Sequence, residues 1–160
     1  MYDKRETDIS YKYLKSIISK LQEPIIIIGG WIEKELGFVP VDEPLIKLVF
    51  ASKKYRTELI EFRKKLWLPS PYLLLTTKIN AIVNRTKDHK RVKDYCDIVA
   101  ICLYSGENTN NLTLFVKENA IKERILKLKK IINQDELKQV SNILRINIDI
   151  VNKVINKIVD

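Results

Sequence analysis

The stretch PIIIIGGW, at residues 24–31, decides the expected fold of this 160-residue chain. Four consecutive isoleucines have the length of a strand, and their uniformly apolar character predicts burial on both faces. Gly29 and Gly30 end this strand, and a short helix is expected from Trp31 to Leu36. A glycine pair between a buried strand and a helix lets a phosphate approach free backbone N–H groups. The same pair is also a common tight turn.

Outside this stretch, the pattern predicts a second strand and a series of helices. A helix is expected over Asp8–Leu21 and a strand over Pro44–Ala51, whereas Lys53–Leu66 is polar and fits a strand end and a helix. Later helices are expected from Pro71 to about Asn84, and over Arg91–Tyr104, Leu112–Ile132, Asp135–Leu144 and Ile148–Val159. The predicted class is α+β, a small mixed sheet followed by a helical bundle. Residues 1–68 form the αβ core, and residues 69–160 are expected to pack on it as a single domain.

The composition predicts a basic, cytoplasmic protein. The net charge is +9, and 46% of residues are hydrophobic. No apolar run approaches the roughly 20 residues that span a bilayer, and the first residues carry no apolar signal region. The two cysteines, Cys96 and Cys102, are expected to be reduced and buried. Such a charge favours a nucleotide, a nucleic acid or another polyanion, although a lysine-rich surface also serves solubility, as in thermophiles.

Two basic segments later in the chain suit a phosphate ligand. Lys78 and Arg85 are seven residues apart on one expected helix, hence on one face, which fits a triphosphate. The following segment, DHKRVKDYCDI at residues 88–98, adds Lys90 and Lys93. The alternative for both segments is a solvated helix face.

Asp94 and Asp97 are three residues apart in the second of these segments, so they share a helix face. Acids early in a helix can complement the helix dipole. They could also hold the lysines of the preceding helix and fix them for a phosphate.

In this order, IIGGW at 27–31, KINA at 78–81 with Arg85, and KDYCDI at 93–98 resemble the nucleotidyltransferase toxins of abortive-infection (type IV toxin–antitoxin, AbiE-type) systems. The HKRVKD run at 89–94 is similar to the archaeal branch. The resemblance implies a polymerase-beta-like fold and Mg²⁺-dependent transfer of a nucleotide from a nucleoside triphosphate to an RNA or protein acceptor. It also implies that Gly29 and Gly30 cradle phosphate, that Lys78 contacts the triphosphate, and that an antitoxin protein is a partner. Asp97 matches the family's later polar motif, with Asp94 as its support.

The acidic centre departs from this family. Two carboxylates alternating on a strand after the glycine pair would share one face and bind the metal ions. Here Asp42 and Glu43 follow Gly30 at a plausible distance in the sequence. They are adjacent, however, and adjacent residues on a strand face opposite sides. Pro44 follows them, and proline is unfavourable in a central strand. Three alternatives remain: a degenerate relative without catalysis, a chain from which the acidic strand is missing, or a metal site at Asp42 and Glu43 in an irregular loop.

The expected function is therefore nucleotidyltransferase-like, with weak nucleotide binding and little or no transfer. The rival is a non-catalytic nucleic-acid or nucleotide binding module that grips phosphates through Lys87, Lys90, Arg91 and Lys93. Residues 135–158 could form a helix-turn-helix. The last helix, however, is apolar along one face, which suits core packing or a homodimer contact.

Overall fold

The computed structural model describes residues 4–20, 25–26, 44–61 and 64–160. The chain divides into two compact units, Met1–Ser70 and Pro71–Asp160. The predicted α+β class is confirmed, because a small sheet occurs in the first unit and helices make up the second. None of the described helices is long and apolar enough to cross a membrane.

The first unit contains a three-stranded mixed sheet. Its strands are β1 (Ile25–Ile26), β2 (Arg56–Glu61) and β3 (Lys64–Pro69), in the order β1-β3-β2. β1 runs parallel to β3, with Ile25 opposite Leu66, and β2 and β3 form an antiparallel pair. The backbone register of this pair places Glu61 opposite Lys64. Among the described strands β3 is central, whereas the sequence suggested that role for the isoleucine strand.

The strand expected over Pro44–Ala51 is wrong, because these residues form the helix α2 (Pro44–Ala51). Proline at the first helical position is favourable, since it has no N–H to leave unpaired and its φ is already helical. Val49 is fully buried while Phe50 is 61% exposed, so the apolar side chains of α2 are not all buried. The segment Lys53–Leu66, expected to hold a strand end and a helix, instead contains the 3-10 turn η1 (Lys53–Tyr55), the strand β2 and the start of β3 in its described residues.

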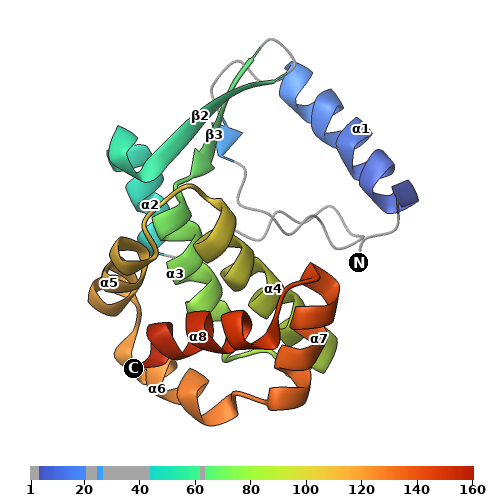
Figure 1. Ribbon diagram of the computed structural model, residues 1–160. Coiled ribbons are helices and arrows are strands. Elements are labelled where there is room, and N and C mark those ends of the chain that lie inside the picture. Colours follow the sequence, from blue (N-terminus) through green and yellow to red (C-terminus); the bar gives the residue numbers. More distant parts are fainter. Residues whose placement is uncertain (1–3, 21–24, 27–43, 62–63) are drawn as a thin grey trace. The chain divides into compact units, whose positions relative to one another are not determined.

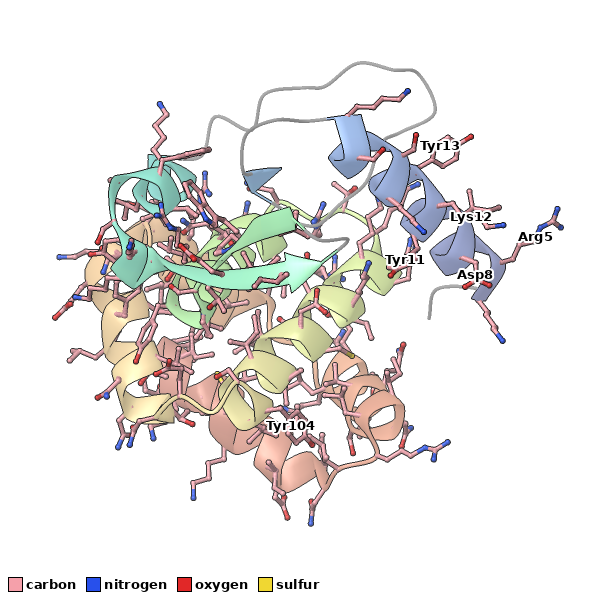
Figure 2. The ribbon with its side chains drawn as sticks, turned by 90° about the horizontal axis from the view of Figure 1, so that it is seen from above. Arg5, Asp8, Tyr11, Lys12, Tyr13 and Tyr104 are labelled. Atoms are coloured by element: carbon pink, nitrogen blue, oxygen red, sulfur yellow. The ribbon has the colours of Figure 1, made fainter. Side chains whose placement is uncertain are left out.

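The N-terminal helix α1 (Lys4–Lys20) confirms the helix expected over Asp8–Leu21, although it begins four residues earlier. Its aromatic residues are exposed, since Tyr13 is 64% exposed and Tyr11 is 51% exposed. In Figure 2, Arg5 and Tyr13 project from one flank of α1 and Tyr11 projects from the other. Exposed aromatic rings therefore lie on more than one side of this helix.

The second unit is a bundle of helices (Figure 1). They are α3 (Pro71–Ile82), α4 (Asp88–Tyr104), α5 (Thr109–Asn119), α6 (Lys122–Ile131), α7 (Gln134–Leu144) and α8 (Ile148–Val159). α3 packs beside α4, and α4 also contacts α7 and α8. Their shared core includes Ile79, Tyr95, Leu112, Val140 and Ile155, each fully or almost fully buried.

Both cysteines lie in this core, which confirms the expectation of buried, unpaired thiols. Burial raises the pKa of Cys102 to about 11, since the apolar surroundings disfavour a thiolate, and nearby Lys157 opposes this only in part. The apolar face of α8 is also buried, at Val151, Ile155 and Ile158. That burial favours the core interpretation of the last helix over a helix-turn-helix or a dimer contact.

One long helix was expected over Leu112–Ile132, but the chain breaks at Ala120 and Ile121 between α5 and α6. A distant residue stabilises the break. Asn80 on α3 is buried. Its side-chain oxygen accepts a hydrogen bond from the Ile121 backbone N–H (3.3 Å), and its backbone carbonyl accepts one from the Arg124 guanidinium (2.9 Å). The segment itself has no glycine or proline to mark this break.

Asparagine caps begin three of the helices. The side chains of Asn108, Asn133 and Asn147 each accept the backbone N–H two residues later at 2.8 Å, at the starts of α5, α7 and α8. Arg145 ends α7 in the left-handed conformation, with φ of 55°. These caps explain why α7 and α8 match their expected ranges so closely.

Candidate functional site

Four ionised side chains meet on one side of the α3–α4 pair. The Lys78 ammonium of α3 lies 3.1 Å from Asp94 Oδ1 and 2.6 Å from Asp97 Oδ2, both on α4. Arg85, three residues after α3 ends, donates from Nε to Asp94 Oδ2 at 2.8 Å. We call Lys78, Arg85, Asp94 and Asp97 the α3–α4 ion cluster. The expectation that the two aspartates hold the lysine of the preceding helix is confirmed.

Local sequence explains how these side chains meet. Leu75, Ile79 and Ile82 fix the buried face of α3, which leaves Lys78 at its flank. Arg85 is held in a turn by its own N–H, which donates to the Ile82 carbonyl at 3.0 Å. Lys78 and Arg85 therefore converge on Asp94 from a helix and a turn, not from one continuous helix face.

Burial differs across the cluster. The side chain of Asp94 is 3% exposed, whereas those of Lys78, Asp97 and Arg85 are 30%, 37% and 39% exposed. A buried carboxylate needs partners, because leaving a charge unpaired away from water is costly. Asp94 has two, one cation on each oxygen. The three other groups remain open to solvent.

The ammonium of Lys78 is stabilised in its charged form. Burial alone would lower its pKa, but the hydrogen bond and charge of Asp97, together with Asp94, raise the pKa above the ordinary value. Lys78 is therefore a fixed positive charge at neutral pH. Its two carboxylate partners, Asp94 and Asp97, hold the ammonium in place.

Spare hydrogen-bond donors remain in the cluster. An ammonium has three donors, and the two aspartates occupy two of those on Lys78. Arg85 donates to Asp94 through Nε, and its two terminal nitrogens form no hydrogen bond with a described residue. Phosphate oxygens are suitable acceptors for such donors, because a guanidinium can bind them in a bidentate way.

Lys90 and Lys93 extend the positive charge along α4. Both are exposed, and Lys90 lies one turn before Asp94 on the same face of the helix. Neither belongs to the ion cluster. With the cluster they give six charged side chains of net charge +2, counted over Lys78, Arg85, Lys90, Lys93, Asp94 and Asp97.

A second buried ion pair joins α4 to α7 and was not anticipated from the sequence. Arg91, assigned to a phosphate grip in the alternative hypothesis, donates instead to Glu136 from NH2 at 2.5 Å and from Nε at 3.1 Å. The Glu136 side chain is only 5% exposed. Arg91 therefore links two helices. A pattern over one segment cannot reveal a partner 45 residues away.

The phenol of Tyr95 is buried beside this pair. Its hydroxyl forms no hydrogen bond with a described residue. Burial, followed by the charge of Glu136, raises the pKa of Tyr95 to about 12, and Arg91 opposes this shift. The phenol is therefore neutral at physiological pH.

Other expected site residues lie outside the described part of the chain. These are Gly29, Gly30, Asp42 and Glu43, together with the helix expected over Trp31–Leu36. Among the described residues, no group of three or more His, Cys, Asp or Glu side chains could hold a metal ion. Asp94 and Asp97 face cations, so they do not fit a Mg²⁺ site either. No family model, curated protein or solved structure matches this chain.

Proposed function

We propose that this protein is nucleotidyltransferase-like and that the α3–α4 ion cluster contacts the triphosphate of a bound nucleotide. The observation that most supports this is the pairing of Lys78 with Asp94 and Asp97. The pairing holds an ammonium in one place, keeps it charged, and leaves it one spare donor. The exposed Lys90 and Lys93 add positive charge beside it.

The proposed reaction is transfer of a nucleotide from a nucleoside triphosphate to an RNA or protein acceptor. Mg²⁺ enters this proposal through Asp42 and Glu43, because no group of three or more His, Cys, Asp or Glu side chains among the described residues could hold a metal ion. When bound, Mg²⁺ would offset the negative charge that develops on the phosphoryl oxygens. Adjacent residues suit shared coordination poorly, so we expect weak binding and poor or absent transfer.

Nucleotide binding tests the role of the cluster. Isothermal titration of the full chain with ATP and with GTP, in the presence of Mg²⁺, should show Lys78→Ala binding about tenfold more weakly than the wild type. That factor corresponds to about 1.4 kcal/mol, the scale of one hydrogen bond to a charged group. The matched control is Lys138→Ala, since Lys138 also pairs with an aspartate but lies on α7. Equal affinity for the wild type and Lys78→Ala would contradict the proposal.

Label transfer tests the reaction itself. The full chain is incubated with labelled nucleoside triphosphates, Mg²⁺ or Mn²⁺, and bulk tRNA. Robust transfer that disappears in Asp42→Ala or Glu43→Ala would identify that pair as the metal site and overturn the expected poor transfer. Nucleotide binding without any transfer would favour a non-catalytic nucleotide-binding module.

A further inference from the structure

The positive charge of the helical unit is concentrated in α6 and the end of α5. The unit contains sixteen basic and ten acidic residues, a net charge of +6. Residues 117–130 alone contain six basic and two acidic residues, a net charge of +4. Most of the unit's excess charge therefore lies in fourteen consecutive residues, away from the α3–α4 ion cluster in the sequence.

The solvent-facing side of α6 has an exposed leucine with three lysines and one glutamate, Glu123, within one turn of it. Leu128 is fully buried, which fixes the inward face of the helix. Leu126 on the opposite side is 62% exposed. Helical spacing places Lys122 one turn before Leu126, and Lys129 and Lys130 one turn after it. All three lysines are exposed.

Most of these lysines form no ion pair with the part of the chain that the structure describes. Lys129 pairs with Asp160 at 2.8 Å, but both side chains are more than half exposed, so the pair is weak. Lys122, Lys127 and Lys130 form no ion pair with a described residue. The basic residues of the α3–α4 ion cluster, by contrast, face buried or half-buried carboxylates. Uncompensated charge on α6 therefore attracts anions.

A shallow hollow adjoins this surface between α5 and α6. It has a volume of about 240 Å³ and is lined by Lys117, Lys122, Ile125 and Leu126. Its lining is mainly aliphatic and includes the two lysines. A flat apolar group can enter such a hollow while its anionic substituents reach the lysines.

We propose that the α5–α6 basic surface binds a single-stranded polynucleotide. This surface comprises Lys117, Lys122, Leu126, Lys127, Lys129 and Lys130. The lysines contact phosphates, and one unstacked base lies in the hollow against Leu126. The proposal rests on the proposed function in one respect, namely that the bound strand includes the nucleic-acid acceptor.

The features of this surface favour a single strand over other anionic partners. A duplex keeps its bases stacked, so it can use the lysines but not the hollow. Protein interfaces have apolar centres that are depleted in lysine, whereas here three lysines and one glutamate lie within one turn of a single exposed leucine. RNA and DNA share the required phosphates and bases.

Fluorescence anisotropy with labelled twelve-nucleotide oligouridylate and oligodeoxyuridylate tests the proposal on the full chain. The test variant is Lys122→Gln/Lys130→Gln, and the control is Lys138→Gln/Lys153→Gln, an equal charge change at exposed positions of α7 and α8. Each phosphate contact contributes about 0.7 to the slope of log affinity against log salt for single strands. The test variant should lower the slope by about 1.4 and the low-salt affinity at least tenfold. The control should change neither.

Further measurements separate the outcomes. Leu126→Ala should weaken single-strand binding several-fold with an unchanged salt slope, because it alters the hollow and not the charge. Duplex binding as tight as single-strand binding, or equal losses in the test and control variants, would overturn the proposal. Binding to phosphatidylserine vesicles without oligonucleotide binding would also overturn it. Oligouridylate and oligodeoxyuridylate differ only in the 2′-hydroxyl, so stronger binding of the first would identify RNA as the source, and the reverse would identify DNA.

The same variants show whether one proposal fails without the other. ATP binding should be unchanged in Lys122→Gln/Lys130→Gln, because neither lysine belongs to the α3–α4 ion cluster. Loss of ATP binding in the wild type, with oligonucleotide binding intact, would reject the proposed function and leave the polynucleotide site standing. Oligonucleotide binding that depends on Lys78 instead of Lys122 and Lys130 would reject the α6 site.

Discussion

Asp94→Asn tests whether the ion cluster stabilises the α3–α4 pair. The substitution keeps the shape of the side chain but removes the negative charge that faces both Lys78 and Arg85. Removing one partner of a buried ion pair costs about 3–5 kcal/mol, whereas exposed pairs contribute about 0.2–1 kcal/mol. Asp94 is 3% exposed but its partners are 30% and 39% exposed, so we expect a loss of about 2–3 kcal/mol.

The assay can follow the helical unit separately. Both tryptophans, Trp31 and Trp67, belong to the first unit. Tryptophan fluorescence therefore reports that unit, while far-UV circular dichroism is dominated by the helices. For a unit of this size, about 2–3 kcal/mol corresponds to a fall in Tm of roughly 8–24 °C.

Asp135→Asn is the matched control, because Asp135 also pairs with a lysine but its side chain is 81% exposed. It should change the free energy of unfolding by less than about 0.5 kcal/mol. A loss below about 1 kcal/mol for Asp94→Asn would refute the reasoning that a buried charge bridges the two cations. A double-mutant cycle with Lys78→Met should give a coupling energy of at least about 0.5 kcal/mol.

Three further substitutions test the cluster and the bundle. Asp97→Ala removes a partly exposed charge and the oxygen that accepts from Lys78, which frees a donor on Lys78, so we expect ATP to bind more tightly in titration while Tm changes little; weaker ATP binding would contradict the spare-donor argument. Folding raises the pKa of Tyr95 from 10.0 to about 12, so the stability it contributes is complete below pH 10 and is lost as the pH rises toward 12. Urea unfolding between pH 9 and 11 should therefore be less pH-dependent in Tyr95→Phe than in the wild type, and identical slopes would exclude this linkage. Arg145→Gly should raise the free energy of unfolding by about 0.5–1 kcal/mol, because glycine adopts a φ of 55° without steric cost; a lower Tm would show that the Arg145 side chain contributes more than that strain.

Helical periodicity predicted much of the second unit, and its failures have physical causes. α7 and α8 carry asparagine caps and strong apolar faces, so local signals agree with the tertiary structure. The break between α5 and α6 depends on hydrogen bonds that Ile121 and Arg124 donate to Asn80, about 40 residues away, which no local pattern contains. For α2, a short apolar run fitted a strand as well as a helix, and Pro44 was the signal that distinguished them.

The candidate site was partly predictable for a similar reason. Spacing placed Asp94 and Asp97 on one face and suggested a lysine partner from the preceding helix, which the structure confirms. Spacing also suggested that Arg91 grips phosphate, but a buried glutamate on α7 binds its guanidinium. Whether a basic residue is available to a ligand depends on long-range partners, which a single sequence does not contain.

The spare hydrogen-bond donors of the α3–α4 ion cluster help to distinguish a purely structural role from a ligand-binding role. A cluster with a purely structural role is most stable when every charged group has a hydrogen-bond partner in the protein, because a donor without such a partner adds nothing to stability. Asp94 fits that description, since it is buried and has a cation on each oxygen. Lys78 and Arg85 do not, because both keep solvent-exposed surface and donors that no described residue accepts. Water satisfies those donors in the free protein, and a phosphate can replace it without breaking either bond to Asp94. The same four residues can therefore stabilise the helix pair and bind an anion.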